Sequence, residues 1–178
     1  MSDSLVSMPL YGNMVTVSTL GLESLGYVGA LGASASATYP TANLAMFFPF
    51  RVFNPNGIVI VKLVVSNGAS ILGNIDVGIY DASGTKLVSS GSTAQAGISA
   101  LQEFDIADTT LGPGVFYLAV AMNNTTGTLT RNSLFVKQSR MLGCLQMATA
   151  FPLPATATFA TSTNGYLVHM MGTTRTVV

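Results

Sequence analysis

Hydrophobic and polar positions alternate along much of this chain over short stretches, which is the pattern of β-strands. Residues 71–80 place Ile71, Gly73, Ile75, Val77 and Ile79 on one face and Leu72, Asn74, Asp76, Gly78 and Tyr80 on the other. Residues 115–122 likewise place Phe116, Leu118, Val120 and Met122 together. The continuous apolar run at residues 58–65 is typical of a strand that is buried on both faces or covered by a partner.

Further strands and the turns between them complete the pattern. Strands are predicted at residues 44–53, 85–90, 100–106, 128–130, 134–137, 156–161 and 166–171, and a helical turn or loop at residues 140–150. Pro49 predicts an edge position or a bulge, and residues 81–84 predict a hairpin turn. Strands separated by Gly, Pro and Asn turns predict an all-β, antiparallel, jelly-roll-like β-sandwich.

The first part of the chain lacks this pattern. Residues 1–40 are rich in Gly, Ala, Ser and Leu and have neither a helical nor a strand period. We interpret them as an N-terminal arm that docks on a partner, the alternative being a flexible leader, and residues 41–178 as the sandwich. The candidate partner contacts in the arm are Leu20, Leu22, Leu25, Tyr27, Val28 and Leu31. The aromatic residues predicted to seal the sandwich or a seam between subunits are Phe47, Phe48, Phe50 and Phe53.

Charge is scarce, with 7 Lys+Arg and 7 Asp+Glu among 178 residues. That is 8%, against roughly 25% in ordinary soluble domains. Either Ser, Thr, Asn and Gly form the polar coat, or other subunits cover much of the surface, and both explanations fit. The balance of acidic and basic residues leaves no basic surface of the kind that binds nucleic acid. The chain has no continuous run of about 20 apolar residues, so we expect no membrane-spanning helix. The N-terminus does not resemble a signal peptide, so we expect synthesis in a host cytoplasm.

The chain offers little catalytic chemistry. His169 is the only histidine and Cys144 the only cysteine, so a zinc site lacks ligands and an intrachain disulfide is impossible. Glu103, Asp105 and Asp108 form the one acidic cluster, which is either a solvated strand edge or a Ca²⁺ site. We therefore expect neither an enzyme nor a cofactor.

Residues 78–91 and 111–119, together with residues 151–158, resemble β-sandwich proteins encoded among the structural genes of tailed bacteriophages. The first stretch matches a G-x-Y-D-x-x-G-x-x-L-x-x-S-G hairpin. The second matches an L-x-P-G-x-Y-Y-L-A strand, with Phe116 in the first aromatic position. The resemblance covers residues 44–171.

The resemblance implies a virion component. The function it favours is that of a capsid decoration (cement) protein on the outside of the head, where it stabilises the joints between capsomers. The implied partners are the major capsid protein and further copies of the chain, as a homotrimer. The alternative is a tail-fibre or head-fibre module that binds a glycan of the host surface. Sugar-binding sandwiches usually display aromatic platforms, whereas this chain has no Trp, and Tyr80, Tyr117 and Tyr166 lie on different predicted strands.

Overall fold

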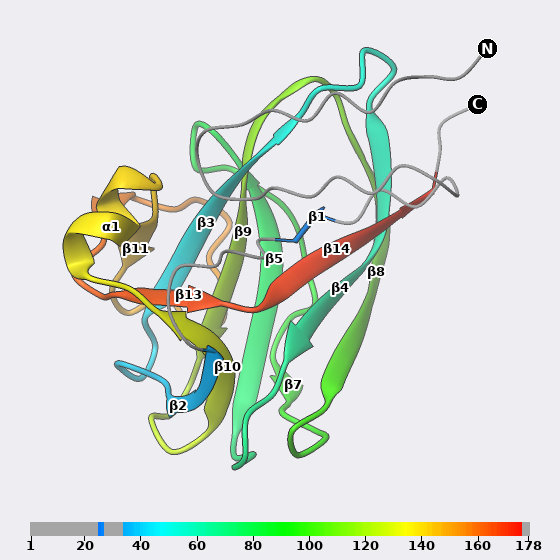
Figure 1. Ribbon diagram of the computed structural model, residues 1–178. Helices are drawn as coiled ribbons and strands as arrows, with labels where there is room; N and C mark the ends of the chain where they lie inside the picture. Colours follow the sequence, from blue (N-terminus) through cyan, green and yellow to red (C-terminus); the bar gives the residue numbers. More distant parts are fainter. Residues whose placement is uncertain (1–24, 27–33, 176–178) are drawn as a thin grey trace.

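The structure of the chain is a computed structural model, which describes residues 25–26 and 34–175 (Figure 1). Its strands are β1 (Leu25–Gly26), β2 (Ser34–Thr38), β3 (Ala45–Val52), β4 (Ile58–Ser66), β5 (Asn74–Asp81), β6 (Lys86–Ser89), β7 (Thr93–Ala94), β8 (Leu101–Leu111), β9 (Gly114–Met122), β10 (Thr128–Ser133), β11 (Leu145–Met147), β12 (Ala160–Thr161), β13 (Tyr166–Val168) and β14 (Met170–Arg175). In the described part of the chain the single helix is α1 (Val136–Met141), which has neither the length nor the apolar composition to cross a membrane.

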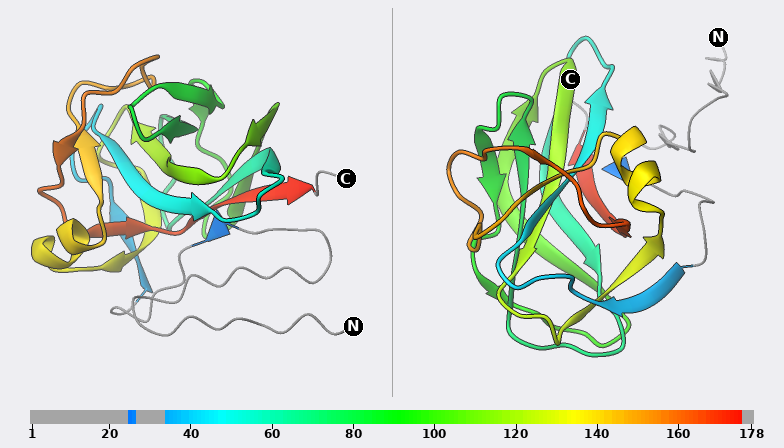
Figure 2. Two further views of the ribbon diagram at one scale, coloured as in Figure 1. Left: turned by 90° about the horizontal axis from the view of Figure 1, so that it is seen from above. Right: turned by 90° about the vertical axis from the view of Figure 1, so that its left-hand side faces the viewer.

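Two antiparallel sheets face each other, as the sequence predicts (Figures 1 and 2). One has the strand order β12-β11-β3-β9-β5-β6, with β7 also paired to β5, and the other has the order β1-β14-β4-β8. A small third sheet, β13-β10-β2, lies beside them. The chain crosses between the facing sheets from β3 to β4, from β4 to β5 and from β8 to β9. The all-β sandwich is thus confirmed, while its jelly-roll character stays a prediction.

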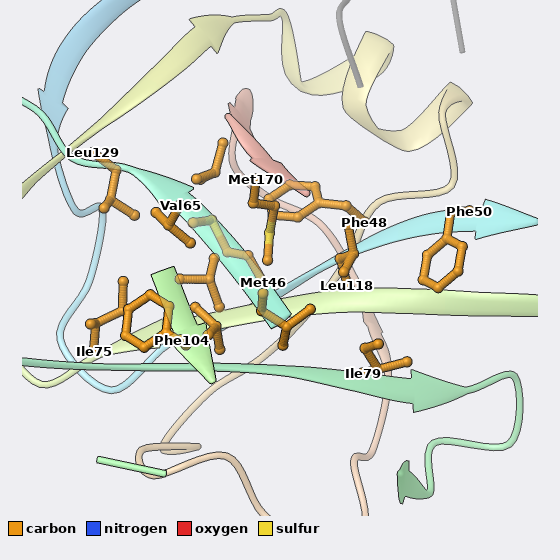
Figure 3. Packing of buried hydrophobic residues seen from close by; sticks show 14 of the residues in the cluster. Met46, Phe48, Phe50, Val65, Ile75, Ile79, Phe104, Leu118, Leu129 and Met170 are labelled. Carbon is orange, nitrogen blue, oxygen red and sulfur yellow. The ribbon is translucent and has the colours of Figure 1, made fainter. Parts of the chain in front are cut away.

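The main core fills the space between the facing sheets (Figure 3). Its members come from the inward positions of the strands, among them Met46, Phe48 and Phe50 from β3, Ile75 and Ile79 from β5, Leu118 from β9, Val65 from β4, Phe104 from β8 and Met170 from β14. The sequence analysis correctly placed Ile75, Val77 and Ile79 on one face of β5, and Leu118, Val120 and Met122 on one face of β9. Both sets face the main core. Pro49 also lies where predicted, because β11 pairs β3 only as far as Phe47, so that at Pro49 the described residues give β3 the one neighbour β9.

The sheet that contains β3, β9 and β5 is covered on its outer face as well. Residues 148–159, here called the covering segment, run between β11 and β12 and pack against that face. Small side chains on this face leave space for the segment. Ala45, Ala119 and Ala121 are fully buried there, beside Phe47 and Tyr80. On β9, large residues therefore face the main core and alanines face the covering segment, so that both faces of one strand are buried.

Three predictions near the C-terminus are wrong or too wide. The strand expected at residues 134–137 is instead the start of α1, because the chain turns at Phe135, whose backbone N–H donates to Oε1 of Gln138 (2.8 Å). Residues 140–150 contain the end of α1 and the strand β11. Of the strand expected at residues 156–161, only β12 forms, because the preceding residues belong to the covering segment.

The folded unit begins before residue 41. Strand β2 pairs with β10 over its whole length, and Tyr39 is buried, with its hydroxyl 2.7 Å from the Leu44 carbonyl oxygen and 2.8 Å from that of Val120. Strand β1 pairs with β14, with Leu25 opposite Gly172. The predicted arm residues Leu20, Leu22, Tyr27, Val28 and Leu31 lie outside the described residues.

Candidate functional site

The four aromatic residues predicted to seal the sandwich or a seam occupy three different environments. Phe48 and Phe50 lie in the main core. Phe47 is on the opposite face of β3 and meets Tyr80 edge-on, with ring centroids 5.2 Å apart. Phe53 follows β3 and is 64% exposed, with the Arg51 guanidinium 5.2 Å from its ring centroid. Three of the four therefore stabilise the fold, and Phe53 alone is available to a partner.

The acidic cluster lies on β8, an edge strand of its sheet. Glu103 and Asp105 are exposed, and Glu103 forms an ion pair with Lys62 of β4 (2.9 Å), which raises the pKa of that lysine. Within the residues that the structure describes, no group of three His, Cys, Asp or Glu side chains is close enough to hold a metal ion. Charged side chains on an exposed edge hinder pairing with a foreign strand. The solvated edge is therefore the reading that the geometry supports.

His169 lies between β13 and β14, where the chain passes from the small sheet β13-β10-β2 to the sheet β1-β14-β4-β8. Its Nε2 lies 2.6 Å from Oδ1 of Asn132, its backbone N–H donates to Thr130 and its carbonyl accepts from Ser66. Burial lowers the pKa of the imidazole, so the ring is neutral at pH 7. These bonds hold together elements of two sheets, and they give His169 a structural role.

Cys144 is buried in the main core. Burial raises the pKa of its thiol to about 12, so the reactive thiolate is scarce at neutral pH. A buried thiol of this kind behaves as a small apolar side chain.

Asp76 is a candidate functional residue that the sequence analysis did not identify. It is 0% exposed and lies on the outer face of β5, under the covering segment. Burial raises the pKa of its carboxyl from the ordinary value of 3.8. The backbone N–H of Leu153 (2.9 Å), the charge of Lys86 and the Ser90 hydroxyl (3.4 Å) act against that rise. The available signal was a lone carboxylate between Ile75 and Val77, on the face that also carries Gly78 and Tyr80.

Lys86 completes this arrangement from β6. Its Nζ donates to the Leu153 carbonyl (2.6 Å), and its backbone N–H donates to that of Ala155 (2.9 Å). Tyr80 donates its hydroxyl to the Pro154 carbonyl, and burial raises the pKa of that hydroxyl. Asp76, Lys86 and Tyr80 thus hold the backbone of one short stretch of the covering segment. Asp76 and Tyr80 are buried here, and the three side chains attach the covering segment to the sheet.

The tyrosines considered for sugar binding are used inside the chain. Tyr80 is buried, and the ring of Tyr117 lies 4.8 Å from that of Phe159, centroid to centroid. Tyr166 carries the Arg131 guanidinium 3.8 Å from its ring centroid, and its hydroxyl donates to the Thr38 carbonyl. Each of these rings is already paired with a neighbour in the fold.

Large apolar side chains are nevertheless exposed, and they are spread over several parts of the described surface. They are Phe53, Leu72, Leu87, Ile98, Leu101, Val115, Phe135 and Met141. Comparison with models of protein families, with curated proteins and with solved structures gives no match. The candidate functional features are therefore the exposed apolar side chains on a weakly charged β-sandwich.

Proposed function

We propose that the chain is a structural protein of a bacteriophage virion that decorates the outside of the capsid and stabilises the joints between capsomers. The observation that carries the proposal is the use of the reactive side chains. Asp76, His169 and Cys144 each serve packing or hydrogen bonding within the fold. The exposed apolar side chains are what remains for contact with a partner.

The scarcity of charge supports the same function. A surface with few ions docks on another protein with little desolvation cost. A protein that binds only the assembled capsid stabilises that state by mass action, because disassembly must first release it. The resemblance of residues 44–171 to phage sandwich proteins supplies the class of partner, the major capsid protein.

In this proposal the arm residues Leu20, Leu22, Tyr27, Val28 and Leu31 contact neighbouring capsid subunits. Leu25, whose backbone pairs with β14 of its own chain, contacts them from the surface of the sandwich, and the sandwich associates with copies of itself.

The test uses the full chain and undecorated capsids made from the major capsid protein of the same phage. We expect the chain to sediment with the capsids, in hundreds of copies per head by quantitative mass spectrometry, and to raise the temperature at which heads burst. A matched variant lacks residues 2–24, which keeps every described strand, β1 included. It should stay folded and bind capsids more weakly, because it lacks Leu20 and Leu22.

Unchanged binding by this variant would refute the role of Leu20 and Leu22. Normal head stability with lost adsorption to host cells, after deletion of the gene, would refute decoration and favour the glycan-binding alternative. A dozen or fewer copies per virion would also contradict decoration, since joints between capsomers occur all over a head.

A further inference from the structure

Among the residues that the structure describes, one end of the sandwich carries no charged side chain. It consists of residues 67–73, 94–101 and 123–127, here called the uncharged end, and lies beside β7 at the bottom of Figure 1. None of these three loops contains Lys, Arg, Asp, Glu or His. Charge begins two residues beyond Leu101, with Glu103 and its partner Lys62.

Three of the eight large exposed apolar residues in the described part of the chain lie at this end. Ile98 and Leu101 are each 63% exposed, and Leu72 is 52% exposed. Two backbone bonds join the loops that carry them, because Ser99 donates to Gly68 (2.8 Å) and Asn67 donates to Ala100 (2.9 Å). The loops that carry these side chains are therefore joined to one another.

Buried amides hold this surface in a fixed shape. Asn67 is 0% exposed and donates to Oε1 of Gln102 (3.0 Å), and it accepts from Nε2 of Gln95 (2.9 Å). Gln95 also accepts from the backbone N–H of Leu72 and donates to the Thr128 carbonyl. Such a network orders the loops before any partner arrives, which reduces the entropy lost on binding.

We infer that the uncharged end is the surface through which this chain binds a second copy of itself. In a contact between identical chains related by a two-fold axis, the same patch contributes to both sides, so the patch must be complementary to itself. Close to that axis an exposed Lys or Asp would meet its own copy and be repelled, whereas Ser, Thr and Asn can both donate and accept hydrogen bonds. The polar groups exposed at this end are of that kind, namely Ser70, Ser99, Asn123, Thr125 and Thr126.

The apolar members supply the stabilising contact of such an interface. Ile98, Leu101 and Leu72 would leave water together, and burial of apolar surface is the main favourable contribution to association. This inference deepens the self-association within the proposed function, but it does not depend on capsid binding.

The experiment measures the mass of the full chain by sedimentation equilibrium at several concentrations. We expect the wild type to be oligomeric. We expect Ile98→Glu and Leu101→Glu together to weaken association at least about 100-fold, since burying an unpaired carboxylate at the contact is costly. Met141→Glu is the matched control, because it adds the same charge to an exposed apolar position on α1, and it should associate like wild type.

Circular dichroism checks that each variant is folded. If the glutamate pair unfolds, the neutral variant Ile98→Ser replaces it, with an expected weakening of about tenfold. The dissociation constant of the wild type should also change less than about threefold between 0.05 and 1 M NaCl, because no ions face each other.

Two results would overturn the inference: a wild-type chain that stays monomeric, or folded variants that associate like wild type. Sedimentation with capsids separates this inference from the proposed function. Monomeric variants that still bind capsids support both. If the variants remain oligomeric and no longer bind capsids, the uncharged end is the surface that binds the capsid, and self-association through it is refuted.

Discussion

Replacing Asp76 by alanine should lower the free energy of unfolding by about 2 kcal/mol at pH 7, within the range of about 1–3 kcal/mol for a buried group left without its partner. The backbone N–H of Leu153, which donates to the carboxylate, would lose its acceptor in a place that water does not reach. Lys86 keeps its bond to the Leu153 carbonyl and contributes little to the loss.

For a chain of this length, about 2 kcal/mol corresponds to a fall of about 4–8 °C in the midpoint of thermal unfolding. Circular dichroism or calorimetry can measure that shift. Asp105→Ala is the control, since it removes an exposed carboxylate from β8 and should change stability by less than about 0.5 kcal/mol. Equal midpoints for the two variants would refute the role of Asp76 in attaching the covering segment to the sheet.

The Asp76→Asn variant separates charge from shape. Because the pKa of Asp76 is raised in the folded protein, its folded state gains stability as pH falls from that raised pKa to the ordinary value of 3.8. Asparagine does not titrate, so the stability of wild type relative to Asp76→Asn should increase on acidification. A difference that is flat, or that decreases as pH falls, would contradict a carboxyl whose charge is penalised by burial.

Gly165→Ala should lower the free energy of unfolding by about 3 kcal/mol or more, or prevent folding, because the new Cβ would lie 1.8 Å from the Leu134 carbonyl oxygen. Gly112→Ala is the control, since its new Cβ would have nothing within 4 Å. Equal thermal midpoints for the two variants would contradict the prediction. Cys144 should not react with a thiol reagent at pH 8 until the chain unfolds, since burial raises its pKa to about 12; rapid stoichiometric labelling of the folded protein would show that it is accessible. Because the pKa of His169 is lowered from 6.5, its contribution to stability is present above pH 6.5 and is lost as pH falls through the lowered value. Urea unfolding between pH 8 and 5 should therefore show wild type losing more stability than His169→Gln, and a parallel loss would refute this.

The strands that could be predicted are those whose pattern depends on their own residues. The alternation in β5 and β9 and the turn at Asp81 depend on neighbours close in sequence. Asp81 indeed accepts bonds from Ser83 and Thr85 through Oδ1, which lowers the pKa of its carboxyl. Such local chemistry can be read from the sequence without knowing the rest of the fold.

The elements that could not be predicted depend on distant residues. Helix α1 begins where Leu134 bonds to the carbonyl of Gly165, and its Ser139 hydroxyl bonds to the carbonyl of Asn164. The burial of Asp76 likewise requires the covering segment, whose Leu153 lies far along the chain. Alanines at Ala119 and Ala121 left room for this segment, but small residues in a strand do not indicate what will cover them. The uncharged end could be inferred only after the three loops were seen together.

The crossing of the chain between facing sheets has a consequence for the order of folding. Strand β3 finds its partner not in β4, which follows it, but in β9, with Ala45 opposite Ala121 and Val52 opposite Gly114. Pairing must therefore wait until most of the chain has left the ribosome, and closing so long a loop costs entropy before any contact repays it. We expect refolding in milliseconds to seconds, as in other sandwiches dominated by distant pairings. During synthesis the aromatic face of β3 has no partner strand, and this is the stage at which the chain is most open to aggregation.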